Sequence, residues 1–209
     1  MFHKIKIFRS NLFIFLIIMV SCSSMDSTNK YYSSYLKILE NKNLSQEYKN
    51  YPIFLYIDIE SQLLFLIKKG KTSSIYKTSS SIYGVGSAEG SLKTPLGKHL
   101  ISEKIGKDLP IGAILKGRVY TGSIANILTE PIDTDYDIVT SRILWLEGTE
   151  EDINKGLGVD SKSRFIYIHG TPEEGLIGKP ASNGCIRMYN KDVIELFDIV
   201  DIKTPVWIY

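Results

Sequence analysis

Two residues near the end of the chain could do covalent chemistry together: His169 and Cys185, sixteen positions apart. His169 ends the apolar run Phe165–His169, and prolines and glycines separate it from Cys185. The chain can therefore turn back and bring the two side chains together. A free thiol with a pKa near 8.5 is ionised to only about a few per cent at neutral pH, so it needs an imidazole to take its proton. The pair indicates a cysteine nucleophile with a histidine as general base.

The residues around Cys185 fit acyl transfer. The backbone N–H groups of Asn183, Gly184 and Cys185 follow one another and could point at a developing oxyanion. Ser182 can hydrogen-bond either the turn or a substrate. Arg187 stands two residues after Cys185, so in a strand it shares a face with the thiol. There it could lower the thiol pKa, bind a substrate carboxylate, or pair with an acid of the fold.

Each of these residues also has an ordinary structural interpretation. A lone cysteine in a β protein is often a small buried hydrophobe, and a histidine at the end of a strand is often a hydrogen-bonded structural residue. His99 could line the substrate cleft or be a partly buried strand residue. His99, His169 and Cys185 could also bind zinc, but no short-spaced ligand pair accompanies them. We therefore expect no metal and no other cofactor.

The first 22 residues are typical of an export signal. Three basic residues precede the apolar run Leu12–Val20, which is too short to span a bilayer comfortably, although a single-pass anchor stays an alternative. The segment Met19-Val20-Ser21-Cys22 resembles the cleavage site of bacterial lipoproteins. That resemblance implies a lipidated Cys22, attachment to a membrane, and a place in the periplasm, with the outer membrane favoured. A Cys22–Cys185 disulfide is the alternative for an exported protein with two cysteines.

The rest of the chain divides into a short tether and one domain. Residues 23–51 are polar and contain one apolar pattern with helical spacing, so they predict a tether with a short helix. Residues 52–209 predict one globular domain, since 44% of the chain is hydrophobic. A formal net charge of +2 with scattered lysines does not indicate a nucleic-acid partner.

Short apolar runs between glycines and prolines make the domain mainly β. One helix is expected, capped by Asn190 and presenting an apolar face. Many short strands with one or two short helices favour a β-sandwich or a barrel-like sheet. The expected strands are Ile53–Ile59, Leu63–Ile67, Lys98–Lys104, Ile143–Glu147, Phe165–His169 and Val206–Tyr209, and the expected helix is Lys191–Val200.

The segments His169-Gly170-Thr171 and Ser182-Asn183-Gly184-Cys185-Ile186-Arg187-Met188 resemble the signature of the L,D-transpeptidase catalytic domain (YkuD-like). Thr94-Pro95-Leu96-Gly97 is similar to a second segment of that family. The resemblance covers residues 52–209 and implies a β-sandwich in which Cys185 is the nucleophile and His169 the base. It also implies that the Gly170 carbonyl orients the imidazole. Many relatives have histidine where Asn183 stands, which leaves a side-chain role there in doubt.

The resemblance implies a two-step reaction on peptidoglycan stem peptides. Cys185 would attack the diaminopimelate carbonyl of a tetrapeptide and release D-Ala. The acyl group would then pass to a second stem peptide, forming a 3→3 cross-link, or to a lysine of a lipoprotein. Water as the acceptor would make the enzyme an L,D-carboxypeptidase or hydrolase. A non-catalytic peptidoglycan-binding lipoprotein is the alternative of another class.

Overall fold

The computed structural model describes residues 51–134 and 136–209. The predicted export signal, the lipidation of Cys22 and the tether with its helix lie outside the described residues. Among the residues that are described, none forms a helix with the length and apolar character needed to cross a bilayer.

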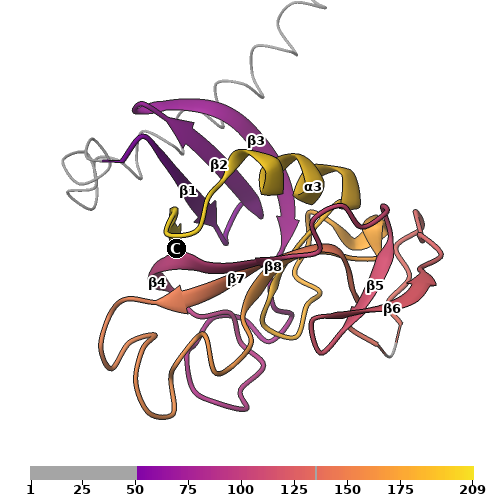
Figure 1. Ribbon diagram of the computed structural model, residues 1–209. Helices are drawn as coiled ribbons and strands as arrows, with labels where there is room; N and C mark the ends of the chain where they lie inside the picture. Colours follow the sequence, from indigo (N-terminus) through magenta and orange to yellow (C-terminus); the bar gives the residue numbers. More distant parts are fainter. Residues whose placement is uncertain (1–50, 135) are drawn as a thin grey trace, which may run out of the picture. The chain divides into compact units, whose positions relative to one another are not determined.

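The described domain is mainly β, as the sequence predicts. Figure 1 shows two facing layers, one containing β1, β2 and β3 and the other β4, β7 and β8. Neighbouring strands follow the order β4-β10-β1-β2-β3-β9-β8-β7, and β7 pairs again with β4, so the layers are joined into a closed, barrel-like sheet. The strands are β1 (Ile53–Asp58), β2 (Leu63–Lys68), β3 (Lys71–Ser79), β4 (Gly97–Ile105), β5 (Ala113–Lys116), β6 (Val119–Ile124), β7 (Val139–Gly148), β8 (Tyr167–Gly170), β9 (Ile186–Met188) and β10 (Pro205–Ile208).

The closed sheet combines antiparallel and parallel strand pairs. Most neighbouring strands are antiparallel, but β1 pairs with β10 in parallel and β8 pairs with β9 in parallel. β1 and β2 form an antiparallel hairpin, and Gln62 in its turn takes a left-handed conformation with φ 55°. Both strands are almost completely buried, and the buried residues belong to both faces of each strand. Near-continuous apolar runs are typical of such strands.

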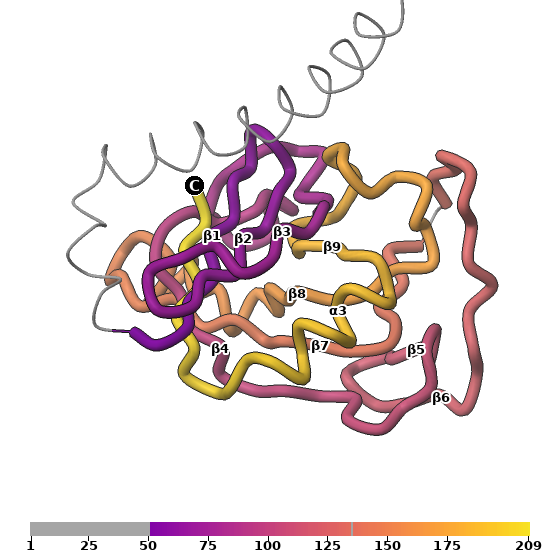
Figure 2. Tube along the Cα trace, turned by 90° about the horizontal axis from the view of Figure 1, so that it is seen from above, coloured from indigo at the N-terminus to yellow at the C-terminus, as the bar shows by residue number. Residues whose placement is uncertain are grey.

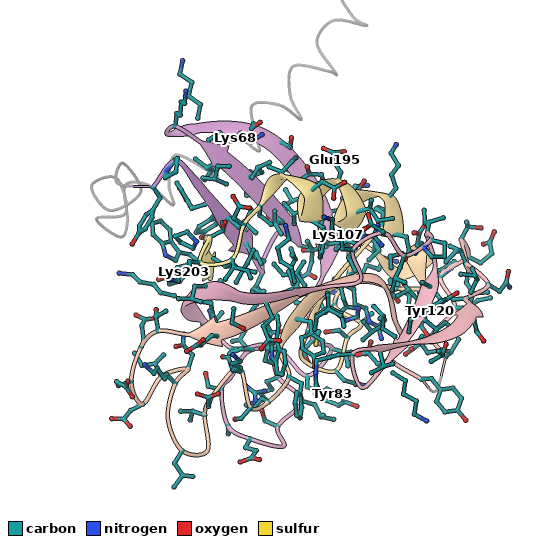
Figure 3. The ribbon with its side chains drawn as sticks, viewed as in Figure 1. Lys68, Tyr83, Lys107, Tyr120, Glu195 and Lys203 are labelled. Carbon is teal, nitrogen blue, oxygen red and sulfur yellow. The ribbon has the colours of Figure 1, made fainter. Side chains whose placement is uncertain are left out.

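One apolar core lies between the layers and the helix α3 (Asn190–Ile199). Val193, Leu196 and Phe197 of α3 are buried against residues of β7 and β8, and full burial of each such side chain contributes about 1.5–3 kcal/mol. Figure 2 shows α3 beside these strands and β9 next to β8. On the other side of α3, Glu195, labelled in Figure 3, accepts a hydrogen bond from the Tyr76 hydroxyl at 2.8 Å.

Asn190 does not cap α3, which corrects the expectation from the sequence. Tyr189 is the capping position and has no side-chain cap, whereas Asn190 is already helical. Glu174 caps the helix from a distant segment: its carboxylate accepts the Asn190 backbone N–H at 2.7 Å. The Asn190 side chain accepts hydrogen bonds from the hydroxyls of Thr140 and Ser141, both at 2.6 Å, and donates to the carbonyl of Thr171. Asn190 therefore connects β7 to the segment that follows His169.

Candidate active site

The parallel pair β8–β9 positions the predicted reactive residues. His169 pairs with Arg187 across this ladder, and side chains two residues apart on a strand face the same side. Cys185 directly precedes β9, and its sulfur accepts a hydrogen bond from the Tyr167 backbone N–H at 3.4 Å. The rings of Tyr167 and His169 meet edge to face with centroids 6.5 Å apart. Cys185, Tyr167, His169 and Arg187 therefore share one face of the sheet.

His169 is fully buried and held through one ring nitrogen. Its Nδ1 donates to the carbonyl oxygen of Gly170 at 2.7 Å, which confirms the predicted contact, while Nε2 has no hydrogen-bond partner among the described residues. Burial lowers the pKa of His169, and Asp137 and the Gly170 carbonyl oppose that shift. The imidazole is therefore neutral near pH 7 and leaves Nε2 as a free proton acceptor.

Gly170 is glycine because the neighbouring chain leaves no room for a side chain. A Cβ there would lie 2.5 Å from the Asn190 side-chain oxygen and 2.8 Å from the Thr140 carbonyl oxygen. The backbone that orients His169 is thus packed directly onto β7 and the start of α3. This packing gives the base a rigid support.

Cys185 is a free cysteine with a partly exposed side chain. Its thiol lies 3.4 Å from the carbonyl oxygen of Phe165, to which it can donate. Burial and, to a smaller extent, the charge of Asp137 raise the pKa of this thiol to about 12, although the Tyr167 N–H, Arg187 and Arg164 act to lower it. The resting site therefore contains a neutral thiol and a neutral imidazole on one face.

The turn before Cys185 is fixed by its own side chains and by the segment 94–97. Ser182 donates to the carbonyl of Cys185 at 2.6 Å and accepts the Gly184 N–H at 3.2 Å, so it bonds the turn. Thr94 donates to the Gly184 carbonyl at 3.0 Å. Gly184 has φ 122°, a conformation that side chains rarely adopt. Thr94 and Gly184 thus explain why both family-like segments belong to one site.

Two of the three amides predicted to form an oxyanion hole are already hydrogen-bonded. The Asn183 N–H donates to Asp137 at 2.8 Å, and the Gly184 N–H donates to Ser182. The oxyanion role of these amides stays a prediction, and it requires that a substrate oxygen displace the Asp137 carboxylate from Asn183.

Arg187 is buried in an ion-pair network, one of the alternatives that the sequence left open. Its guanidinium contacts Asp137 Oδ1 through Nε and Nη2, each at 2.9 Å, and donates through Nη1 to Glu173 Oε2 at 2.7 Å. Glu173 also accepts the backbone N–H of Thr134 at 2.8 Å. Two carboxylates therefore take the guanidinium that was predicted to bind substrate, and substrate binding by Arg187 stays a prediction.

His99 is a structural residue, so its predicted place in the substrate cleft is wrong. Its side chain is 1% exposed in β4, and its two ring nitrogens contact the Gly97 carbonyl at 3.1 Å and the Ser161 hydroxyl at 2.9 Å. Neither nitrogen is free for zinc. No cluster of three potential metal ligands occurs in residues 51–134 and 136–209.

Sequence reasoning missed Asp137, Glu173 and Arg164 as parts of the site. Asp137 and Glu173 stand among other polar residues, where no spacing distinguishes them from solvated surface residues. Arg164 donates to the carbonyls of Gly86 and Lys93, at 3.3 and 2.7 Å, and lowers the pKa of Cys185. Its only signal was its position directly before the apolar run Phe165–His169.

Comparison with known proteins finds curated relatives that match part of the chain. A putative L,D-transpeptidase of Bacillus subtilis (strain 168), YqjB, is 42% identical over 69 residues, which are 30% of this chain and 39% of that protein. YkuD of the same organism, also a putative L,D-transpeptidase, is 61% identical over 41 residues, which are 20% of this chain and 25% of that protein. The aligned segments thus span less than half the length of these curated relatives.

An L,D-transpeptidase from Mycobacterium smegmatis has a similar structure, with a TM-score of 0.46 and 16% identity, over 76% of this chain and 58% of that chain. The family of L,D-transpeptidase catalytic domains (YkuD) matches residues 52–208, nearly all of the described domain. This chain belongs to the L,D-transpeptidase catalytic domain family.

Proposed function

We propose that the protein is a peptidoglycan L,D-transpeptidase in which Cys185 forms an acyl-enzyme with a tetrapeptide stem. The observation that carries this proposal is the state of His169. Its Nδ1 is fixed by the Gly170 carbonyl, and its Nε2 is buried without a partner on the face that Cys185 shares. A buried unpartnered nitrogen costs stability, so a proton-accepting role offers a reason for it.

In the first half-reaction the thiol proton passes to Nε2 of His169, and the sulfur attacks the L-centre carbonyl of diaminopimelate. The tetrahedral oxyanion accepts a hydrogen bond from the Cys185 N–H. Once the Asp137 carboxylate is displaced, it accepts a second one from the Asn183 N–H. The C–N bond to D-Ala then breaks, and the imidazolium returns its proton to the departing amine. These steps leave a thioester and a neutral His169.

In the second half-reaction an amine attacks the thioester carbonyl and gives its proton to His169. The C–S bond breaks, and the proton returns to the thiolate of Cys185. A diaminopimelate amine gives a 3→3 cross-link, a lysine amine attaches a lipoprotein, and water gives a trimmed stem. The same residues serve all three acceptors, so the products identify the acceptor.

The site should act outside the cytoplasm, where peptidoglycan is found. The lipoprotein-like segment ending at Cys22 supports a lipid anchor facing the periplasm, although it lies outside the described residues. Metabolic labelling with a fatty acid tests this part separately. Label incorporated by the wild type and absent from Cys22→Ala supports the anchor, and equal label in both contradicts it.

The chemical proposal is tested by intact-mass spectrometry of the protein after incubation with a carbapenem and with a tetrapeptide stem. We expect a covalent adduct on the wild type and none on Cys185→Ala, with D-Ala release by the wild type alone. An unchanged adduct in Cys185→Ala would exclude Cys185 as nucleophile. Stem-peptide binding without D-Ala release by the wild type would instead support the non-catalytic alternative.

A further inference from the structure

Arg118 is held beside the candidate active site by three aromatic residues. It lies in the turn between β5 and β6, a hairpin that packs alongside β7 (Figure 1). Its guanidinium carbon is 4.5 Å from the centre of the Trp145 ring and 5.1 Å from that of Phe165. Nη1 donates to the Tyr167 hydroxyl at 3.2 Å. We call Trp145, Phe165 and Tyr167 the aromatic clamp, because together they restrict this cation to one position.

A second cation over the same indole ring shows what Arg118 lacks. Lys162 Nζ lies 5.5 Å from the centre of the Trp145 ring and forms ion pairs with Glu103 at 3.4 Å and Glu147 at 3.9 Å. Within residues 51–134 and 136–209, no carboxylate lies within ion-pair distance of Arg118. Its charge is therefore positioned by aromatic rings and left without a counter-ion in the described domain.

Tyr167 links this cation directly to the nucleophile. The backbone N–H of Tyr167 donates to Cys185 Sγ, while its hydroxyl accepts from Arg118. Burial raises the pKa of Tyr167, Arg118 opposes the rise, and Cys185 adds to it, so the phenol is within electrostatic reach of both groups. Phe165 is 50% exposed, and Arg118 and Trp145 are partly exposed, so a ligand can reach the guanidinium from solvent.

We propose that Arg118 and the aromatic clamp bind a free carboxylate of the substrate whose carbonyl reacts with Cys185. The proposal rests on the proposed function and adds a specificity-determining residue to it. A guanidinium presents several N–H donors in a fixed plane and can bind a carboxylate through two parallel hydrogen bonds. A tetrapeptide stem has two carboxylates close to the reacting carbonyl: that of the departing D-Ala and that on the side chain of diaminopimelate.

The test measures binding of a tetrapeptide stem to the full-length Cys185→Ala protein by calorimetry, so that turnover plays no part. We expect Arg118→Gln in this background to raise the Kd about 10- to 100-fold, because a hydrogen-bonded charge pair is lost. The Kd of Arg118→Lys in the same background should lie between those of Cys185→Ala alone and of Arg118→Gln, since lysine keeps the charge and loses the planar donor set. The matched control is Lys116→Gln, an exposed residue of the same hairpin, which should leave the Kd unchanged.

Two amidated peptides identify which carboxylate is bound. The effect of Arg118→Gln should disappear with the peptide amidated at the carboxylate that Arg118 recognises, and persist with the other. Equal affinity of both proteins for the unmodified peptide, with native circular dichroism retained, would overturn the proposal. So would a loss that persists with both amidated peptides, because Arg118 would then recognise neither carboxylate beside the reacting carbonyl. If the Cys185→Ala protein with Arg118 intact binds no stem peptide, the proposed function is overturned as well.

Discussion

Two histidines, His99 and His169, lie buried in the same closed sheet and differ in how their ring nitrogens are used. Burial lowers the pKa of both, for His99 to about 4. Both nitrogens of His99 have partners, Gly97 and Ser161, whereas only Nδ1 of His169 has one. Burial and a lowered pKa therefore do not identify a catalytic base in this domain. The distinguishing feature is an unpartnered nitrogen on the face that carries a thiol.

The strongest way to break this comparison is to remove each imidazole in turn. We expect His169→Ala to lower the rate of acylation by a carbapenem by about 10²- to 10⁴-fold, the usual contribution of a general base. His99→Ala, compared at a temperature where it is folded, should retain the rate within about a few-fold, because its ring reaches no reacting atom. Stopped-flow fluorescence with mass detection of the adduct measures both. Equal losses in the two variants would refute the distinction.

The pH dependence of stability tests the structural role of His99. Its folded-state pKa, about 4, lies below the unfolded value of 6.5, so the unfolded chain binds the proton more readily. The stability from the neutral ring is complete above pH 6.5, is lost as the pH falls toward 4, and amounts to on the order of 3 kcal/mol. Urea unfolding of the wild type and of His99→Gln measures it. The variant should show the shallower decline, and parallel curves would contradict the assignment.

The fold was predictable where one apolar pattern decides the structure. β1, β2, β4, β7, β10 and the helix α3 were predicted to within a few residues at each end. All except β4 contribute a buried apolar run or face, and β4 alternates buried and partly buried residues over its first half. β3 was not predicted, because its sequence KTSSIYKTS is polar and its first half is exposed. Pairing with β2 and β9 makes it a strand, and such pairing over long sequence separation leaves no local pattern. β9 has three residues and was missed for the same reason.

The site was predictable where chemistry restricts residue type, and not where charges pair over distance. Cys185 and His169 were predicted because a thiol nucleophile needs an imidazole base. The Gly170 carbonyl was predicted from the resemblance to the family. The partners of Arg187 lie 50 positions before it and 14 positions before it, at Asp137 and Glu173. Nothing in the sequence around either acid distinguishes it from a surface carboxylate. Their role depends on a buried arginine that only the folded sheet brings to them.

The smallest expected effect concerns these two acids and sharpens the comparison of the histidines. Asp137 raises the pKa of Cys185 and of His169 and is not among the groups acting on His99. Asp137→Asn removes this charge, while the new amide oxygen can still accept the Asn183 N–H. We expect the thiol pKa to fall and alkylation by iodoacetamide near pH 8 to become about two- to tenfold faster. The titration of His99, followed by NMR, should not move.

Glu173→Gln is the matched control, because Glu173 binds the same guanidinium and does not contribute to the pKa of either reactive group. It should lower stability by about 1–3 kcal/mol, since it weakens a buried charge pair, and leave the alkylation profile in place. If Asp137→Asn leaves alkylation unchanged, or if Glu173→Gln accelerates it equally, the network holds two loops together without setting thiol reactivity. The different environments of His169 and His99 would then arise from hydrogen bonding alone, with no contribution from the charge of Asp137.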